Sequence, residues 1–307
     1  MSSVVMHCMR GRCRTLLIGF ALGISPQTHA VDLTPDASRI LSDPAFVPSA
    51  RQLIGATTYG YSKDSADVVG TSAASQYSLV RRVGGVSQAF SYGITDELSV
   101  WGGESYSWST TEYDFGSGAD TSIRRYYRQL QIGVTDRLID QRNHDFNLDV
   151  SAYAPGGVNI AISRTMTDLT LRGSAGIYHV GYENGIDEVR DFNVTVNRYW
   201  GYFFSLQSEM RLTRFLAFDV SAAYDSANVN SVHASSSGGS FAIDYPNQVD
   251  LGLALSYQLI PDKWVAKLGL GYGFLGTRRD VYADPSLDVQ TAHRSVRSIG
   301  LSLFYSL

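Results

Sequence analysis

The chain has 307 residues, of which 44% are hydrophobic and 18% are charged, and its formal net charge is −4. Nucleic acid is a poor partner for a mildly acidic protein, because binding phosphate backbones requires a basic footprint, and it is excluded from the partners that we expect. Both cysteines, Cys8 and Cys13, fall within the first 30 residues, so the rest of the chain can form neither a disulfide nor a cysteine metal site.

Residues 1–30 have the features of an export signal. Three arginines between positions 10 and 14 precede an apolar stretch, residues 15–24, that is too short to cross a bilayer as a helix. Residues 28–30, Thr-His-Ala, form an acceptable small-residue cleavage site, and we expect the mature chain to start at Val31. A buried N-terminal helix is the alternative, but it explains neither the charges nor the cleavage site. Without the signal, 22 basic and 29 acidic residues remain, a net charge near −7.

We expect residues 31–51 to be an N-terminal segment that precedes the following domain and lies on its periplasmic side. Asp36 could cap a short helix that runs to Leu41 and ends before Pro44. The segment could remain a periplasmic tail or fold into the domain as a plug, and we prefer the tail.

Residues 52–307 alternate between apolar and small or polar side chains, the signal of β-strands that are apolar on one face. In the stretch 249–259, the large residues are Val249, Leu251, Leu253, Leu255, Tyr257 and Leu259. The pattern predicts twelve strands, at residues 52–61, 85–94, 98–110, 123–134, 146–154, 158–165, 169–181, 192–212, 215–225, 248–259, 264–275 and 293–307.

This pattern indicates a transmembrane antiparallel up-and-down β-barrel of about twelve strands. In hydrocarbon every backbone N–H and C=O must be paired within the protein, which leaves only helices and closed barrels. A tilted strand crosses a bilayer with about ten residues, the length seen here. The connections alternate between short turns and long Ser- and Gly-rich loops (62–84, 111–122, 226–247 and 276–292), as outer-membrane barrels do. An even strand number places both barrel ends on the periplasmic side, and the long strand 192–212 should project outside.

Two strands carry a charge on the face that should be apolar. Glu104 shares parity with Leu98, and Arg128 shares parity with Leu130. An arginine at the bilayer midplane costs about 2–4 kcal/mol, falling to about 0–1 kcal/mol near an interface. Either these residues lie near the outer rim or a bulge shifts the parity.

The parity also predicts two sets of site residues. Aromatic side chains near strand ends suit interfacial girdles: Tyr92, Tyr224, Tyr257, Trp264, Tyr272 and Phe274. The opposite face should line the lumen with Asp149, Arg172, Gln207, Glu209, Arg211, Asp219, Asp250, Gln258 and Lys267. Such charges either pair and fill the lumen or leave a gap that selects solutes. Twelve strands lie between a filled barrel of eight and a wide channel of sixteen, and we favour a narrow pore.

Candidate chemistry is sparse. His233 and Ser235 form a His-x-Ser pair similar to the base and nucleophile of outer-membrane phospholipase A, which also has twelve strands. The flanking residues differ, however, and a solvated loop histidine is the simpler interpretation. His144, His179 and His293 have no metal-ligand spacing, and no calcium loop is present. We therefore expect neither a catalytic site nor a metal nor a cofactor.

The C-terminal sequence SIGLSLFYSL alternates and ends with Leu303, Tyr305 and Leu307, which resembles the C-terminal assembly signal of Gram-negative outer-membrane barrels. The stretches YGITDELSV (92–100) and IGVTDRL (132–138) resemble periplasmic turns of such proteins, including the phenol-degradation-pathway outer-membrane proteins, which are assumed to be transporters. The resemblance implies a location in the outer membrane. The partners that it implies are lipid and lipopolysaccharide, the barrel assembly machinery and small solutes.

We therefore expect a porin-like barrel that passes small solutes passively and has no enzymatic activity. An outer-leaflet lipid hydrolase that uses His233 and Ser235 is one alternative. A surface or adhesive barrel with a closed lumen is the other.

Overall fold

The computed structural model describes residues 46–70, 76–115, 121–154, 156–180, 183–187, 192–196, 199–228, 232–236, 239–244, 247–282 and 288–307, some of them in the backbone alone. Within these ranges no helix is long and apolar enough to cross a membrane.

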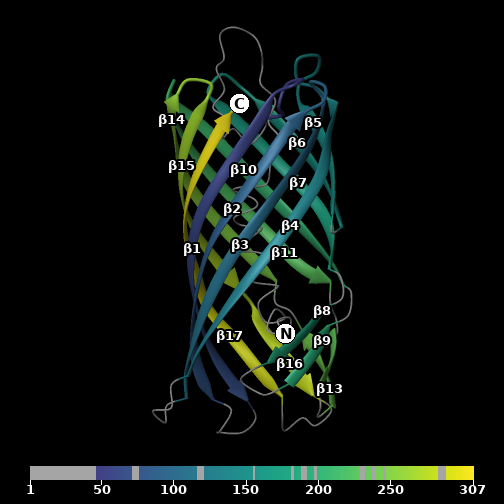
Figure 1. Ribbon diagram of the computed structural model, residues 1–307, viewed down its shortest axis with the longest axis vertical. Coiled ribbons are helices and arrows are strands. Elements are labelled where there is room, and N and C mark those ends of the chain that lie inside the picture. Colours follow the sequence, from purple (N-terminus) through teal and green to yellow (C-terminus); the bar gives the residue numbers. More distant parts are fainter. Residues whose placement is uncertain are drawn as a thin grey trace.

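Twelve antiparallel strands form a closed barrel (Figure 1), which confirms the predicted fold class. Around the barrel they are β1 (Leu53–Gly70), β2 (Tyr77–Gly93), β3 (Leu98–Asp114), β4 (Thr121–Ile139), β5 (Asn147–Ala154), β6 (Gly157–Thr165), β7 (Leu169–Val180), β10 (Tyr199–Thr213), β11 (Leu216–Asn228), β14 (Gln248–Ile260), β15 (Trp264–Leu275) and β17 (Val289–Ser306).

The barrel closes where the first strand meets the last. β1 pairs with β17 along its length, from Ile54 opposite Ser306 to Gly70 opposite Val289. Closure gives each of the twelve strands a neighbour on both sides, so the backbone groups over the height that neighbouring strands share are paired within the chain. This satisfies the condition that a hydrocarbon surrounding imposes.

The two faces of the wall differ sharply. On β10, Leu206 is 68% exposed, whereas Glu209 is 5% exposed. On β14, Leu251, Leu253 and Leu255 are exposed and Ser256 is fully buried. In a closed barrel the exposed face is the outward one, so the apolar side chains point out and the polar side chains point in.

Among the described residues, five further strands lie at one end, and three of them continue the wall. These are β8 (Glu183–Asp187), β9 (Phe192–Val196), β12 (Val232–Ser236), β13 (Gly239–Asp244) and β16 (Thr277–Tyr282). β16 pairs with β17 beyond the end of β15, β13 pairs with β16, and β12 pairs with β13, while β8 and β9 form a separate hairpin. In Figure 1 the labelled strands of this group gather at the lower end, and the C-terminus lies at the upper end. We call these ends the long-strand end and the short-turn end.

The predicted strand count of the closed barrel, twelve, is correct, but several predicted strand and loop ranges are wrong. Residues 62–84 are not a loop, because β1 and β2 continue through most of this range. Residues 192–212 are not one strand but two, β9 and β10. The predicted loops 226–247 and 276–292 contain β12, β13 and β16. Beyond the lipid a strand needs no apolar face, so its alternation disappears while its backbone still pairs.

Short turns connect neighbouring strands at the short-turn end. Between β2 and β3 the Thr95 hydroxyl accepts hydrogen bonds from the amides of Glu97 and Leu98 at 3.1 and 2.9 Å. Thr213 does the same for Phe215 and Leu216 between β10 and β11. A threonine hydroxyl can hydrogen-bond nearby backbone amides and so stabilise a turn, which explains the Thr at these turns. The stretch 132–138, which resembles a periplasmic turn, is instead part of β4, which runs to Ile139.

The two charges on the apolar face stay outward. The pairing of β3 with β4 has no register shift, so the predicted alternative of a bulge is wrong. Glu104 and Arg128 are exposed and form an ion pair with each other. Each charge thus has a partner of opposite sign on an otherwise mostly apolar outward face.

Candidate functional site

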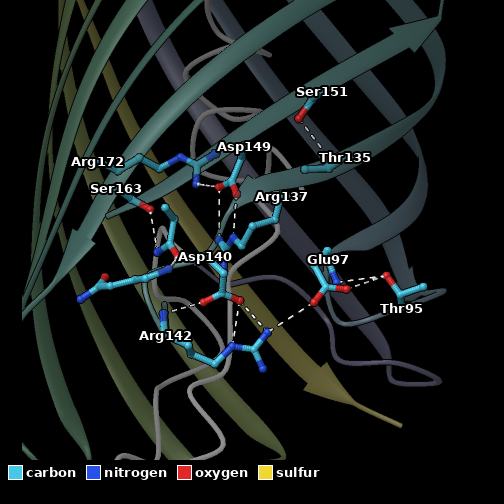
Figure 2. A network of polar contacts seen from close by, with 12 residues as sticks. Thr95, Glu97, Thr135, Arg137, Asp140, Arg142, Asp149, Ser151, Ser163 and Arg172 are labelled. Carbon is cyan, nitrogen blue, oxygen red and sulfur yellow. Dashed lines mark hydrogen bonds and ion pairs between the residues drawn. The ribbon is translucent and has the colours of Figure 1, made fainter. Parts of the chain in front are cut away.

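A three-residue ionic cluster lies inside the barrel near the short-turn end (Figure 2). The Asp149 carboxylate of β5 accepts hydrogen bonds from Nε and Nη2 of Arg137 of β4, at 2.8 and 3.2 Å. Nη1 of Arg172 of β7 donates to the same carboxylate at 2.9 Å. All three side chains are at most 2% exposed. One anion therefore holds two cations from three strands.

Two further ion pairs stand on the inward face. The ammonium of Lys267 of β15 lies 2.8 Å from Oδ1 of Asp219 of β11, and Ser256 donates to the other oxygen at 3.2 Å. On β1 and β2, which follow β15 and β17 around the barrel, Asp64 and Arg81 lie 3.5 Å apart and are buried. These ion pairs are thus spread along the wall rather than gathered at one point.

A second polar network stands in the turn between β4 and β5 (Figure 2). The Asp140 carboxylate accepts hydrogen bonds from the backbone amide of Arg142 at 2.8 Å and from Nε and Nη2 of its guanidinium at 2.8 and 2.5 Å. Burial raises the pKa of Asp140, but these hydrogen bonds and the charges of Arg142 and Arg137 together lower it below its ordinary value. The hydrogen bond to Asp140 likewise raises the pKa of Arg142.

On the inward face, aromatic residues and glycines alternate from strand to strand along one line of cross-strand partners, which we call the aromatic row. From β3 to β10 the row reads Trp101, Gly133, Tyr153, Gly157, Tyr178 and Gly201. Each ring lies over the glycine of the next strand, where a Cβ atom would collide with it. Trp101 and Tyr153 are also in ring contact, with centroids 6.1 Å apart. Because the glycines have no side chain, the rings can lie along the wall instead of crossing the lumen.

The segment before β1 enters the short-turn end. Phe46 and Val47 are 3% and 1% exposed, and Phe46 packs against inward residues of β1, β11, β15 and β17, namely Ile54, Ala217, Val265 and Phe304. The amide of Arg51 donates to the carbonyl of Gly93 at 2.8 Å, and the amide of Gly93 donates to that of Gln52 at 3.0 Å. Phe46, Val47 and Pro48 therefore lie inside the barrel mouth, whereas Ala50 and Arg51 are exposed. Residues 31–45 lie outside the described residues.

Most of the residues predicted to line the lumen occupy inward positions. Asp149, Arg172, Glu209, Asp219 and Gln258 are buried, and Gln207, Arg211, Asp250 and Lys267 are half-buried. The two carboxylate oxygens of Asp250 accept hydrogen bonds from the side-chain Nε2 of Gln248 at 2.7 and 2.8 Å. The structure brings together Asp149 with Arg172, and Asp219 with Lys267. Sequence reasoning missed Arg137, the second cation that pairs with Asp149, because residues 132–138 resemble a turn.

The predicted girdle and assembly residues occupy outward positions. Tyr92, Tyr257, Trp264, Tyr272 and Phe274 are exposed, and Tyr224 is half-buried. Leu303 and Tyr305 of β17 are half-buried, and Leu307, which follows the strand, is exposed. The ring of Tyr305 covers Gly55 of β1 and contacts Trp264 and Phe90, with centroids 5.6 and 6.4 Å apart.

The predicted hydrolase pair cannot be assembled from this structure. The backbone at His233 and Ser235 belongs to β12, opposite Ala242 and Ser240, but both side chains lie outside the part that is described. Among the described residues no group of three His, Cys, Asp or Glu side chains could hold a metal ion.

No protein-family model and no curated protein matches the chain. Solved structures do. An outer membrane channel of the COG4313 group from Pseudomonas putida F1 has a TM-score of 0.54 at 13% identity, covering 84% of this chain and 96% of that chain. The transport unit of the autotransporter AIDA-I from Escherichia coli has a TM-score of 0.50 at 8% identity, covering 94% and 97%. At these identities the likeness concerns the fold, and at that level it confirms the resemblance to Gram-negative outer-membrane barrels.

Proposed function

We propose that the protein is an outer-membrane channel through which small solutes pass passively. The observation that carries the proposal is the division of a closed twelve-strand wall into an outward apolar face and an inward polar face. Such a wall suits lipid on its outer side and water on its inner side. Twelve strands also enclose a wider interior than the eight strands of a barrel that side chains fill.

In this proposal the short-turn end faces the periplasm and the long-strand end faces outwards, since outer-membrane barrels have short periplasmic turns and longer external loops. A solute would pass the inward aromatic row and then the ionic clusters. Trp101, Tyr153 and Tyr178 present flat rings along the wall, and their faces favour solutes with a planar apolar part.

Residues 46–51 narrow the periplasmic mouth in this arrangement, because Phe46 and Val47 fill it against four strands. The resting conductance should therefore be small, and passage should require the segment to shift.

The test is single-channel recording of the full-length protein in planar bilayers. We expect discrete conductance steps, and we expect benzoate to interrupt the current more often than acetate at equal concentration. Trp101→Ala should abolish the difference between the two anions while leaving the steps. A protein that folds and inserts but never conducts would contradict the proposal and favour the closed, adhesive barrel.

The hydrolase alternative has its own test. Ser235→Ala should leave phospholipid hydrolysis by the purified protein unchanged if the channel proposal is correct. Hydrolysis that disappears in this variant would assign the serine a catalytic role.

A further inference from the structure

Three cations lie side by side on the outward face of neighbouring strands. Lys63 of β1 stands directly opposite Arg297 of β17 on one side and Arg82 of β2 on the other. Lys63 and Arg297 are exposed, and the side chain of Arg82 is 38% exposed. We call these three residues the cationic row. Like charges in directly opposite cross-strand positions destabilise a sheet, so the row needs an anion to be favourable.

The protein itself supplies only part of that negative charge. Arg82 forms an ion pair with Glu112 of β3, whose side chain is 49% exposed. Neither Lys63 nor Arg297 forms an ion pair with any residue that the structure describes. Counting Glu112, the row retains an excess of two positive charges.

The cationic row stands where the outward face stops being apolar. On β17 the outward residues from Leu307 to Ile299 carry no charge, and the next outward residue is Arg297. On β1, Tyr59 and Tyr61 precede Lys63 in the same way. This is the depth at which the hydrocarbon of a surrounding bilayer gives way to headgroups.

An outward aromatic cluster lies next to the row on its apolar side. Its ring centroids are 6.4 Å apart for Tyr59 and Trp108, 6.2 Å for Tyr106 and Trp108, and 6.2 Å for Tyr106 and Tyr126. Aromatic side chains of this kind gather at the interface between hydrocarbon and headgroups. A lipid with acyl chains against the cluster would place its headgroup at the cationic row.

We propose that the cationic row binds the phosphate groups of a phosphorylated glycolipid in the outer leaflet. The charge excess selects an anionic headgroup, and the adjoining aromatic cluster selects a ligand with acyl chains over a free anion. The inference rests on the membrane placement in the proposed function but not on conduction, so a barrel that fails to conduct could still bind the lipid.

The test measures binding of bisphosphorylated lipid A to the full-length protein in a neutral detergent, by the rise in its thermal unfolding temperature during titration. The row variant carries Lys63→Gln, Arg82→Gln and Arg297→Gln. A matched control carries Arg164→Gln, Arg214→Gln and Lys263→Gln, which removes the same charge from exposed positions outside the row. Resistance of each variant to unfolding in unheated dodecyl sulfate checks that it is folded. The single variant Lys63→Gln serves if the triple variant does not fold.

The control should bind as tightly as the unmodified protein, and the row variant should bind between about tenfold and about a hundredfold more weakly, since each basic residue near an anionic lipid surface contributes roughly 1 kcal/mol. Lys63→Gln alone should weaken binding about fivefold. Equal affinity of the row variant and the control would overturn the proposal. So would equal binding of lipid A stripped of its phosphates, which would leave only apolar contact. Stabilisation by inorganic phosphate at the same phosphate concentration would also overturn it, by showing an anion site with no preference for lipid.

Discussion

At the scale of single residues, the inward charges are distinguished by how completely they are paired. Asp149 lies between Arg137 and Arg172 and is 1% exposed. Desolvating three charges is expensive, and the expense is offset only while each cation faces the shared carboxylate. Such a cluster is therefore far more sensitive to the loss of its central member than an exposed pair is.

Replacing Asp149 with Asn should destabilise the barrel by about 3–5 kcal/mol, because two buried guanidinium groups would then face each other without an anion. The measurement is equilibrium unfolding in urea with the protein in lipid vesicles.

The control is Asp136→Asn, one residue from Arg137 on the exposed face of β4, which should change the unfolding free energy by no more than about 0.5 kcal/mol. Equal effects of the two substitutions would show that the cluster contributes nothing beyond an ordinary surface carboxylate.

Asp140 gives a prediction about pH. Its folded-state pKa is lowered, so its pairing with Arg142 stabilises the folded protein above the unfolded pKa of an aspartate, about 3.9, and this stability is lost as the pH falls through the folded pKa. Asp140→Asn should therefore reduce the unfolding midpoint at neutral pH, and the difference from the unmodified protein should disappear in strong acid.

The check is a series of unfolding curves from neutral pH into strong acid for both proteins. A difference that stays constant over the whole series would mean that the ionised carboxylate does not provide the stability.

At the scale of elements, the backbone of Gly93 is one of the contacts that hold the segment before β1, together with the packing of Phe46. Gly93 ends β2 and exchanges hydrogen bonds with Arg51 and Gln52, and a Cβ atom there would collide with the carbonyl oxygens of Pro48 and Ser49. Backbone atoms cannot yield as a flexible side chain would, so the segment itself must move to accommodate any larger residue.

Gly93→Ala should displace residues 46–51 from the mouth and raise the single-channel conductance at least about twofold while the barrel stays folded. Gly102→Ala is the matched control, since a Cβ atom there would lie 3.5 Å from the nearest backbone oxygen, an ordinary contact. If both variants conduct like the unmodified protein, the segment does not limit the flow.

The alternation of apolar and polar residues predicted the strands correctly wherever one face of a strand is apolar. The stretch from Val249 to Phe274 could be assigned from sequence because a bilayer requires a large apolar side chain at every second position. The stretch from Val232 to Asp244 could not, because β12 and β13 lie beyond the apolar band and their Ser- and Gly-rich sequence carries no periodic signal. A strand outside the apolar band can have the same Ser- and Gly-rich composition as a loop, so composition alone does not distinguish the two.

The residues of the site could not be grouped from the sequence, because the sequence does not show which strands pair or in what register. Parity placed Asp149 and Arg172 on the inward face, but only the register shows that they share a cluster with Arg137. The aromatic row was likewise hidden, because Trp101 and Gly133 become neighbours only when β3 and β4 pair. The alternation of aromatic residues with serine in YSWST (106–110) was a local signal for the outward cluster.

At the scale of the whole molecule, the wall is uneven in height. β4 has 19 residues and β5 has 8, and the strands on the β1–β4 side continue well beyond the apolar band. This extension carries the cationic row, whereas the shorter strands are continued by separate pieces such as β16 and β13. One side of the barrel thus has a continuous outer surface beyond the apolar band.

The measurement that tests the account most directly is a scan of single cysteines along β14, after Cys8 and Cys13 have been replaced by serine. A fluorophore attached at positions 251, 253 and 255 should be quenched by brominated lipid, and one attached at 252, 254 and 256 should not, because the first three side chains face outward and the others inward. Quenching that fails to alternate, or that alternates with the opposite phase, would contradict the claim that lipid covers the apolar face and the polar face lines the interior.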